Sequence, residues 1–513
     1  MPATAPPSMP PADAPRAFAP GAVLLVLGTI TALRLVYLPF HPLDLHPDEA
    51  QYWSWSRDLD WGYFSKPPMI AWLVAASTSL CGAGEACIRA TIPVLHFLTA
   101  LLIYGIGRRL YEDSVGFLAA LAYLTLPGVT FSSAIASTDP PLLTFWALGL
   151  YALVRLMGAG ASRRRWWIVL GIALGLGLLS KYAMAFFVAA LILWLALDAE
   201  ARARLVGDRA GRRGLALAAA LGALIYLPNL VWNATQGFVT YAHTGANADL
   251  GGGLVRPAEF LDFAVSQFGV FGPVLFAMLL GLVAGASRWR AEMRARMLAA
   301  FVLAVLVPVA ALALLTRANA NWAAPAYVAG SVWVTAAMLE GGRRALAWSS
   351  VGLHVAFAAV LMGGLLTQGG AGRYAGLAVP AWLDPYRDYR GWRALGDYVG
   401  VLRASHPGAP LLANDRKLLA AMLYYVRPWP EDAFAWFADG RVTDHYRLTR
   451  PLPPRPGGDF LYVTRWNDNR AVLRRFREHR LVATLALPVA TGVERRVRVF
   501  HVQGFLGYNA RRP

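Results

Sequence analysis

The chain has 513 residues, of which 57% are hydrophobic and only 15% are charged. A soluble protein of this length needs more charge, because water must solvate its whole surface. The formal net charge of +18 would suit a nucleic-acid-binding protein, but the arginines form short clusters between apolar runs, as in loops that fix membrane topology. The composition therefore excludes a soluble enzyme, argues against a nucleic-acid partner and predicts a polytopic α-helical membrane protein.

The opening segment, residues 1–20, is rich in proline and alanine, which predicts a disordered N-terminal tail. It lacks the basic start and short apolar core of a cleavable signal peptide. Beyond it, apolar runs near 20 residues recur, and each can cross roughly 30 Å of hydrocarbon. We expect about 11 transmembrane helices, at 21–40, 90–107, 116–134, 139–156, 166–180, 182–198, 214–232, 263–286, 297–316, 322–340 and 346–367.

Arginine clusters fall on alternate loops between these spans. Examples are Arg108 with Arg109, the run 163–165, and Arg343 with Arg344. Because cytoplasmic loops carry the excess of positive charge, we expect the N-terminus inside. An odd number of spans then places the C-terminal segment outside.

The character of the chain changes near residue 370, where charges, prolines and short apolar runs return. We therefore predict a membrane domain at 21–367 and a water-exposed α/β cap domain at 370–513. A helix is expected in "DPYRDYRGWRALGDYVGVLRASHPG", and a strand turning into a helix in "PLLAND" followed by "RKLLAAMLYYV". Three further strands are expected in "DFLYVTRW", "LVATLALPV" and "RRVRVFHV".

The first outer loop, residues 41–89, contains the stretch "HPDEAQYWSWSRDLDWGYFSKPP". Its crowded aromatic residues, among them Tyr52 and Tyr63, predict helices that lie in the membrane interface. Two adjacent carboxylates, Asp48 and Glu49, follow a proline. They suit either the start of a helix, whose positive dipole end they would face, or a reactive pair, and this stretch alone favours neither.

Three more ionisable residues are expected on the outer side: Asp139 in "SSAIASTDPPLLTFW", Lys66 in "GYFSKPP" and Lys181 in "LLSKYAM". Asp139 would also suit the N-cap of a helix that starts at Pro140, and a lysine at the membrane boundary usually extends its ammonium toward water. Only three lysines occur among 48 lysines and arginines, the third being Lys417. Where arginine is so favoured, a retained lysine indicates a site that needs a compact ammonium.

Two acids and two lysines at one membrane face predict a reaction centre. A transporter would more often place its ionisable groups near the bilayer midplane, in broken helices. The set suits a donor whose leaving group is a lipid-linked phosphate, because this group departs as a stabilised anion and needs cations. The acceptor needs a carboxylate to take its proton and orient it. These requirements fit a single displacement with inversion, with the apolar spans holding a polyprenyl tail.

The motifs "DEAQYW…LDWGYFSKPPMIAWL", "STDPPLLTFWAL", "LLSKY" and "NWAAPAYV" resemble those of bacterial polyprenyl-phosphate-dependent glycosyltransferases. That group includes the protein O-mannosyltransferases and the lipid A aminoarabinose transferases, which share the C-type glycosyltransferase (GT-C) membrane fold. The resemblance covers roughly residues 20–340. It implies a multi-pass protein of the bacterial inner membrane, with its active site and C-terminal domain in the periplasm. It further implies a polyprenyl-phosphate-sugar donor, membrane lipid around the chain, and a glycolipid (lipid A or lipopolysaccharide), glycan, lipid or protein as acceptor.

The resemblance also implies roles for individual residues. Asp48 is expected to be the principal catalytic carboxylate, with Glu49 supporting it and Asp139 orienting donor or acceptor. Lys66 is expected to bind the donor phosphate. Lys181 is our own addition as a second phosphate contact. Further substrate-binding candidates are Arg57, Tyr63 and Tyr52, whereas Asn321, Trp322 and Tyr327 fit a structural role better than a place in the cavity wall.

One departure from the aminoarabinose transferases concerns a metal. The residue before their motif lysine is typically glutamate, proposed to help bind a metal, but here it is Ser65. His41 and His46 flank the acids, yet single interfacial histidines more often serve as hydrogen-bonding groups. We therefore predict no metal and no other cofactor, with a divalent cation as the alternative.

Two other functions compete with glycosyl transfer. A flippase or transporter of lipid-linked sugars would need polar residues at mid-membrane, where only Arg34 and Gln267 stand out, and a membrane scaffold would tolerate changes at Asp48. The sequence names neither the sugar nor the acceptor, and it leaves a disulfide between Cys81 and Cys87 open. The predicted reaction centre lies between the first outer loop and the cap and gathers Asp48, Lys66 and Asp139 in one chamber.

Overall fold

The structure, a computed structural model, describes residues 19–158, 163–248, 255–366, 371–374 and 376–508. Residues 1–18 of the predicted tail lie outside the described residues. The chain divides into two compact units. The helical unit takes in the described parts of Met1–Pro39, Lys66–Ile70 and Arg89–Leu361, and the mixed unit those of Phe40–Ser65, Ala71–Ile88 and Met362–Pro513.

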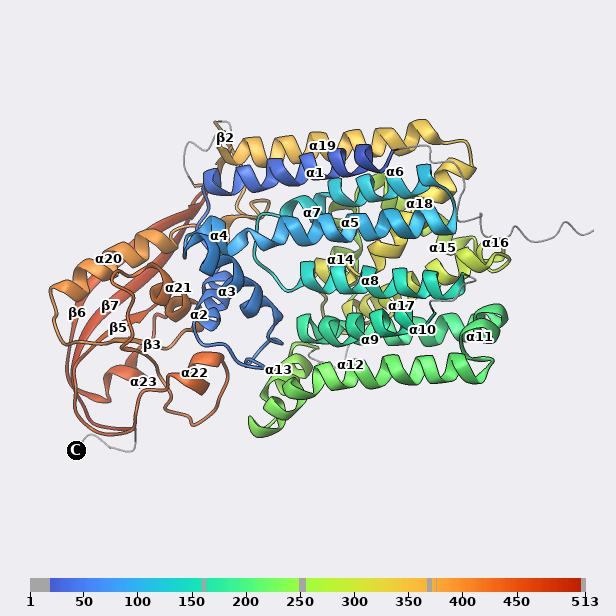
Figure 1. The fold of residues 1–513 in the computed structure, drawn as a ribbon. Coiled ribbons are helices and arrows are strands. Elements are labelled where there is room, and N and C mark those ends of the chain that lie inside the picture. The colour runs from blue at the N-terminus through green and yellow to red at the C-terminus, as the bar shows by residue number, and fades with distance from the viewer. Residues whose placement is uncertain (1–18, 159–162, 249–254, 367–370, 375, 509–513) are drawn as a thin grey trace, which may run out of the picture. The chain divides into compact units, whose positions relative to one another are not determined.

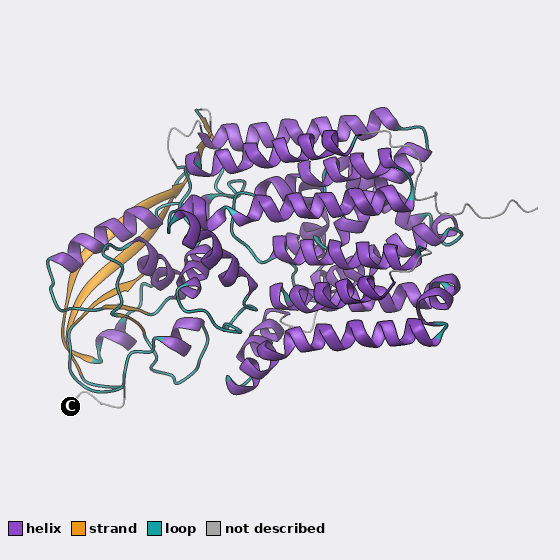
Figure 2. Cartoon of the chain, viewed as in Figure 1, coloured by secondary structure: helices purple, strands orange, loops and turns teal. Residues whose placement is uncertain are grey.

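The helical unit is built from long apolar helices (Figures 1 and 2). These helices pack on one another both in sequence order and across it: α5 lies against α6 and α8, α9 against α8 and α12, and α17 against α10 and α18. Its helices are α1 (Pro20–Tyr37), α5 (Thr91–Leu110), α6 (Asp113–Thr125), α7 (Pro127–Ser132), α8 (Asp139–Met157), α9 (Arg163–Ser180), η2 (Tyr182–Met184), α10 (Ala185–Leu197), α11 (Ala199–Val206), α12 (Arg209–Thr235), α13 (Val239–Ala248), α14 (Pro257–Val270), α15 (Pro273–Ala284), α16 (Ala286–Trp289), α17 (Met293–Leu315), η4 (Ala320–Ala323), α18 (Ala326–Glu340) and α19 (Arg344–Leu366).

Several of these helices have the length and apolarity of membrane spans. Within the described residues six meet that standard, or eight if each of two sharply bent pairs counts as one span. Large apolar side chains such as Leu25, Leu33, Leu224 and Val360 are exposed on α1, α12 and α19, where lipid would cover them at no cost in desolvation. The chain is therefore a polytopic, membrane-embedded helical protein, although 11 spans are not confirmed.

Close packing between α9 and α12 depends on small residues. A Cβ at Gly171 would lie 2.8 Å from the Ala218 carbonyl oxygen, and one at Gly175 would lie 2.6 Å from Cβ of Ile225. Glycines four residues apart let two helix backbones approach closely, which stabilises helix pairs where no hydrophobic effect drives them together. This explains why a glycine-rich run, "LGIALGLGLLS", forms a continuous helix here.

The predicted span at 263–286 is not one straight helix. It begins inside α14, and α14 and α15 meet at a bend of 118°. Gly272 turns the chain with φ +84°, and a Cβ there would lie 2.1 Å from Nε2 of His354, so only glycine fits. Pro273 then starts α15. Similarly, the predicted span at 116–134 is divided at Pro127 into α6 and α7.

The mixed unit combines helices with a five-stranded sheet. The strand order is β4-β3-β5-β7-β6, in which β3 runs parallel to β4 and β5, while β7 is antiparallel to β5 and β6. Its elements are η1 (Leu38–Phe40, at the unit's edge), α2 (Pro47–Ser56), α3 (Met69–Cys81), α4 (Glu85–Arg89), β1 (Arg373–Tyr374), β2 (Leu377–Ala378), η5 (Arg387–Tyr389), α20 (Trp392–Ala404), β3 (Leu411–Ala413), α21 (Arg416–Tyr425), β4 (Ala433–Ala435), α22 (His445–Thr449), β5 (Phe460–Thr464), α23 (Arg470–Leu473), β6 (Phe476–Ala490) and β7 (Val493–Phe505).

The predicted strands and helices of this segment are largely confirmed. "PLLAND" contains β3 and is followed by α21, and the three other predicted strands are β5, β6 and β7. The predicted helix at "DPYRDYRGWRALGDYVGVLRASHPG" begins later than expected, at Trp392, because Gly391 before it takes φ +82° and ends the preceding turn. The short strand β4 was not predicted.

The segment 41–89, the first loop of the sequence analysis, supplies a cap and contacts to the helices α20 and α21. Asp44 Oδ2 accepts hydrogen bonds from the backbone N–H groups of Trp392 at 2.8 Å and Arg393 at 3.2 Å, so it caps the start of α20. The hydroxyl of Tyr425, at the end of α21, accepts from Leu45 N at 2.6 Å and donates to Glu85 at 2.6 Å. Residues more than 300 positions apart in the chain thus form one hydrogen-bonded network.

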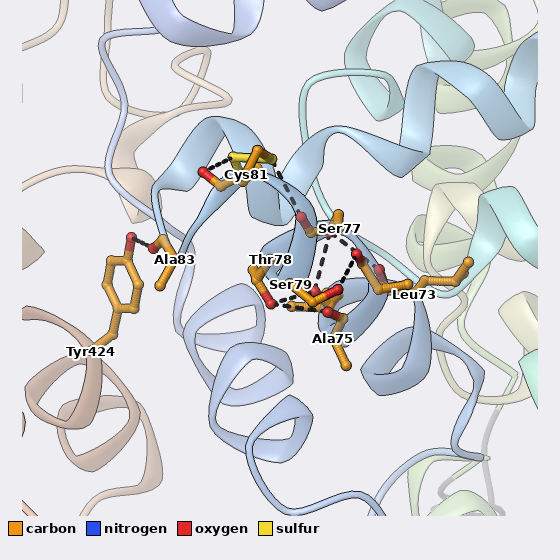
Figure 3. Close-up of a disulfide and its surroundings, with 11 residues drawn as sticks. Leu73, Ala75, Ser77, Thr78, Ser79, Cys81, Ala83 and Tyr424 are labelled. Carbon is orange, nitrogen blue, oxygen red and sulfur yellow. Dashed lines mark hydrogen bonds between the residues drawn. A yellow bond between two sulfur atoms is a disulfide. The ribbon is translucent and has the colours of Figure 1, made fainter.

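Cys81 and Cys87 form a disulfide that joins the end of α3 to α4 (Figure 3). Between them, the Ala83 carbonyl accepts a hydrogen bond from the Tyr424 hydroxyl of α21 at 2.9 Å. The disulfide that the sequence left open is therefore present, and it fixes the turn that presents Ala83 to α21.

Candidate functional site

The start of α2 explains why two carboxylates follow Pro47. His46 is the N-cap: its Nδ1 accepts from Asp48 N at 3.2 Å, and Glu49 Oε2 accepts from His46 N at 2.9 Å. This is a capping box, which satisfies backbone donors that the first turn would otherwise leave unpaired. Glu49 is fully buried in that role. Burial lowers the pKa of His46, against the opposing effect of Asp48 and Glu49, and so favours the neutral ring that can accept.

Asp48 is turned to a different partner. Its Oδ1 accepts a hydrogen bond from Nη1 of Arg416 at 2.7 Å, and the same nitrogen donates to Oε1 of Gln51 at 2.7 Å. Arg416 is the first residue of α21, and α2 packs against α21 in the mixed unit. The Asp48 side chain stays 43% exposed. The capping explanation therefore accounts for Glu49, while the Asp48 carboxylate is directed at a cation from the C-terminal segment.

The other predicted residues of this loop surround α2. Tyr63 stacks on Trp55 with ring centroids 4.4 Å apart, and its hydroxyl accepts from Asp60 N at 3.1 Å. Tyr52 is buried on α2. Arg57, just after α2, is exposed and lies over the rings of Trp53 and Trp429, the latter at 5.0 Å. Tyr63 and Tyr52 are thus part of the packing that holds α2 in place.

A second cluster lies in the helical unit. Lys181 Nζ donates to Asp139 Oδ1 at 2.6 Å, and Asn321 Nδ2 donates to Asp139 Oδ2 at 2.7 Å. The three residues come from the start of α8, the break between α9 and η2, and η4. The side chains of Asp139 and Lys181 are 11% and 17% exposed. The structure therefore brings together two predicted site residues that are 42 positions apart.

Two sequence-based alternatives for this cluster are wrong. Asp139 is not an N-cap, because α8 begins at Asp139 itself, the N-cap is Thr138, and Thr138 makes no side-chain cap hydrogen bond. Lys181 does not extend toward water, because its ammonium pairs with a carboxylate. Asn321 binds Asp139, whereas Tyr327 is buried, stacked on Phe271 at 4.2 Å, and structural as expected.

Lys66 is half-buried and belongs to the helical unit, as Asp139 and Lys181 do. The expectation that Lys66, Asp48 and Asp139 gather in one chamber stays a prediction.

The polar residues inside the apolar spans have local partners. Arg34 donates to the Leu124 carbonyl at 2.6 Å and to Thr130 at 3.1 Å. Gln267 donates to the Phe263 carbonyl at 3.0 Å and accepts from the Tyr327 hydroxyl at 2.6 Å. These bonds give Arg34 and Gln267 a structural reason for their places in the apolar spans.

Among the described residues, no group of three or more His, Cys, Asp or Glu side chains is arranged to hold a metal ion. His41 and His46 are therefore not part of such a group there, and the prediction of no metal stays a prediction.

Comparisons with known proteins agree with the fold and motifs. The family model described as dolichyl-phosphate-mannose-protein mannosyltransferase matches residues 65–232. The chain is 38% identical over 317 residues to the lipid A galacturonosyltransferase RgtD of Rhizobium johnstonii, covering 60% of this chain and 64% of that protein. The crystal structure of ArnT from Cupriavidus metallidurans bound to undecaprenyl phosphate matches with TM-score 0.64 and 16% identity, over 94% of this chain and 98% of the other. The chain therefore has the GT-C fold of ArnT and resembles named glycosyltransferases in sequence.

A further relative in sequence is the undecaprenyl phosphate-alpha-4-amino-4-deoxy-L-arabinose arabinosyl transferase of Pseudomonas aeruginosa. It is 34% identical over 183 residues, covering 32% of this chain and 33% of the relative. The alignments with these two curated relatives thus span less than two thirds of each relative's length, whereas the fold match to ArnT runs along nearly the whole chain.

Sequence reasoning missed two residues of these clusters. Arg416 was hidden because arginine is abundant, and no linear motif singles it out. Asn321 was noted but assigned a structural role, since an amide beside an aromatic residue is common at membrane interfaces. Their contacts with Asp48 and Asp139 follow from the fold.

Proposed function

We propose that this protein transfers a sugar from a polyprenyl-phosphate donor to a lipopolysaccharide acceptor, with lipid A as the first candidate. The reaction would take place at the periplasmic face of the bacterial inner membrane. The observation that carries the proposal is the 38% identity over 317 residues to a lipid A galacturonosyltransferase. The GT-C fold and the two carboxylates bound by cations support the same chemistry.

In the proposed step, a hydroxyl oxygen of the acceptor attacks the anomeric carbon of the donor sugar. The bond from that carbon to the phosphate oxygen breaks, and the configuration inverts. Asp48 accepts the hydroxyl proton, and the polyprenyl phosphate leaves with the bonding electron pair as an anion. Because phosphate is a stable leaving group, the step needs positive charge beside it and no general acid.

Lys66 and Lys181 are proposed to supply that charge. The lysine ammonium has three N–H donors, and Lys181 directs one of them to Asp139. Asp139 and Asn321 therefore act by fixing the direction of Lys181. A compact ammonium suits this task better than a guanidinium fork, which agrees with the retention of lysine in an arginine-rich chain.

The remaining predicted residues are proposed to act around α2. Glu49 supports Asp48 by closing the capping box, which fixes the first turn of the helix. Of the three further predicted substrate contacts, Arg57 is kept as the candidate because its guanidinium is exposed over two tryptophan rings, whereas Tyr63 and Tyr52 are buried in the packing of α2. We propose no metal in this step.

The arginine clusters on alternate loops support a membrane topology. We propose that these loops are cytoplasmic and that the C-terminal segment of the mixed unit is periplasmic. The exposed apolar rows on α1, α12 and α19 are proposed to face lipid, including the polyprenyl tail of the donor.

The test uses the purified full-length protein in liposomes with lipid A. Two donors are supplied in turn: undecaprenyl phosphate carrying galacturonic acid, and undecaprenyl phosphate carrying 4-amino-4-deoxy-L-arabinose. Mass spectrometry should detect lipid A heavier by one sugar residue with one of them. Movement of donor across the bilayer without a new glycosidic bond would support a flippase instead. Glycolipids from cells with and without the protein then identify the natural acceptor.

A further inference from the structure

Arg416 stands at an unusual position for a cation. It is the first residue of α21, where the positive end of the helix dipole disfavours positive charge. The helix offsets this with Asp415, whose Oδ1 accepts from Leu418 N at 3.0 Å and whose Oδ2 pairs with Arg465 at 2.7 Å. Asp415 thus fixes the backbone just before Arg416, because one of its carboxylate oxygens caps α21 and the other pairs with Arg465.

The guanidinium of Arg416 joins two residues of α2. Nη1 donates to both Asp48 Oδ1 and Gln51 Oε1, each at 2.7 Å. Asp48 and Gln51 are three residues apart, so they lie on one face of the helix. Gln51 is buried and Asp48 is 43% exposed, so Arg416 links a buried residue of α2 to an accessible one.

The electrostatics of this contact favour a charged pair. Burial of the Arg416 guanidinium opposes its charge, but the Asp48 carboxylate outweighs that effect and raises the pKa of Arg416. Electrostatic coupling is reciprocal, so the guanidinium favours the ionised carboxylate by the same interaction. The titratable groups around this pair are His46, Glu49 and Tyr52 on α2, Lys417 on α21, and Asp444 and Tyr446 at α22.

We propose that Arg416 is a positioning residue for Asp48, which makes the C-terminal segment part of the reaction centre. Arg416 holds the carboxylate ionised and directed so that it can accept the acceptor proton. This inference rests on the proposed function, in which Asp48 is that acceptor. It goes beyond it by assigning a role in turnover to a residue of the segment after residue 370.

The direct test is Arg416→Gln in the full-length protein, assayed in liposomes with lipid A and the donor found active. Turnover should fall roughly 10- to 100-fold, since a small misplacement of a catalytic group has effects of this order. The KM for the donor should stay the same, and the acidic limb of the pH–rate profile should move to higher pH. Arg416→Lys keeps the charge but loses the planar guanidinium and its fixed geometry, so it should restore the pH profile and only part of the turnover.

Arg403→Gln is the matched control. Arg403 forms an ion pair with Asp432 in the same unit, with side-chain exposures of 24% and 43%, against 30% and 43% for Arg416 and Asp48. Arg403→Gln should leave turnover and pH profile unchanged. Both glutamine variants should show similar unfolding midpoints.

The possible results separate this inference from the proposed function. If Asp48→Asn transfers sugar at the wild-type rate, the proposed function fails and this inference with it. If Asp48→Asn is inactive but Arg416→Gln keeps wild-type turnover and pH profile, only this inference is overturned. Should Arg416→Gln fail to fold, Gln51→Leu decides, because loss of the second acceptor should lower turnover several-fold at unchanged donor KM. Wild-type turnover of Gln51→Leu would then overturn the inference.

Discussion

The two aspartates of the proposed site are held in different ways. Asp139 is enclosed at 11% exposure, with Lys181 on one oxygen and Asn321 on the other. Asp48 is 43% exposed and binds Arg416 through one oxygen. A carboxylate with a donor on each oxygen is suited to stay in place, whereas a more exposed one can meet a substrate hydroxyl. The comparison supports our proposal that Asp48 transfers the proton and that Asp139 anchors a lysine.

The same contrast has an energetic side. An enclosed ion pair has lost most of its hydration, so removing one partner leaves a charge that the remaining contacts compensate only in part. A half-exposed pair is compensated by solvent when it is broken, and it contributes little to stability. We therefore expect changes at Asp48 to affect turnover, and changes in the Asp139 cluster to affect both stability and donor use.

The largest effect is expected for Asp48→Asn. Loss of a general base costs about 10²- to 10⁴-fold in rate, so transfer to lipid A should fall by that factor. The unfolding midpoint should stay close to that of the wild type. Asp432→Asn is the control, because Asp432 is equally exposed and also paired with an arginine. Equal loss of transfer in both variants would remove the distinction drawn for Asp48.

The second effect concerns Lys181→Met. The substitution leaves the Asp139 carboxylate enclosed without its cation, which should destabilise the protein by about 1–3 kcal/mol and lower its unfolding midpoint in detergent. It should also raise the KM for the donor. Adding Asp139→Asn removes the unpaired charge, so the double variant should regain stability without regaining donor affinity. A double variant as unstable as Lys181→Met would contradict an enclosed pair.

The third effect is a pH dependence of stability that arises from His445 in the mixed unit. Burial lowers the pKa of His445 to about 3, and Arg450 adds to the effect. Its ring lies 5.2 Å from that of Trp55, beside α2. The unfolded chain takes up this proton below about pH 6.5, while the folded one does not until about pH 3. Stability should therefore fall as the pH drops below 6.5, by about 2 kcal/mol at pH 5.

The measurement is the unfolding midpoint at pH 7 and pH 5, followed by tryptophan fluorescence. His445→Phe should reduce the difference between the two values, because phenylalanine does not titrate. His479→Phe, at an exposed position on β6, should leave the difference as it is in the wild type. An equal difference between the two midpoints in all three proteins would show that His445 takes up its proton in the folded state as readily as in the unfolded chain.

The smallest effect is expected for Glu49→Gln. The amide oxygen can still accept from His46 N, since glutamine also serves in capping boxes. Stability should fall by less than about 1 kcal/mol, and transfer should stay within about threefold of the wild type. Side by side, Asp48→Asn and Glu49→Gln are the same chemical change at neighbouring positions. If the Glu49 variant lost as much activity, both carboxylates would be reactive.

Sequence patterns predicted the helices better than the contacts between them. Apolar runs mark long spans within a few residues, as for 21–40 and α1 or 346–367 and α19. The bend at Gly272 was missed because hydrophobicity continues through it, although "FGPV" carried a Gly-Pro signal.

The site was predicted only in part for a similar reason. Lysine rarity drew attention to Lys181, but its pairing with Asp139 across 42 positions depends on how α8 and α9 pack. Arg416 had no such signal, because it is one of many arginines and its contact with Asp48 spans 368 positions. Rare residue types can be found in a linear sequence, whereas common ones gain meaning only through their neighbours in the fold.

The cap that Asp44 places on α20 has a consequence for how the protein is made. The backbone donors at the start of α20 find their acceptor in a segment synthesised some 350 residues earlier. While the intervening helices are being synthesised, the backbone donors that Asp44 caps do not yet exist. The start of α20 can therefore be capped only after both segments have been made and have come together. A C-terminal fragment expressed without residue 44 would lack this cap on α20.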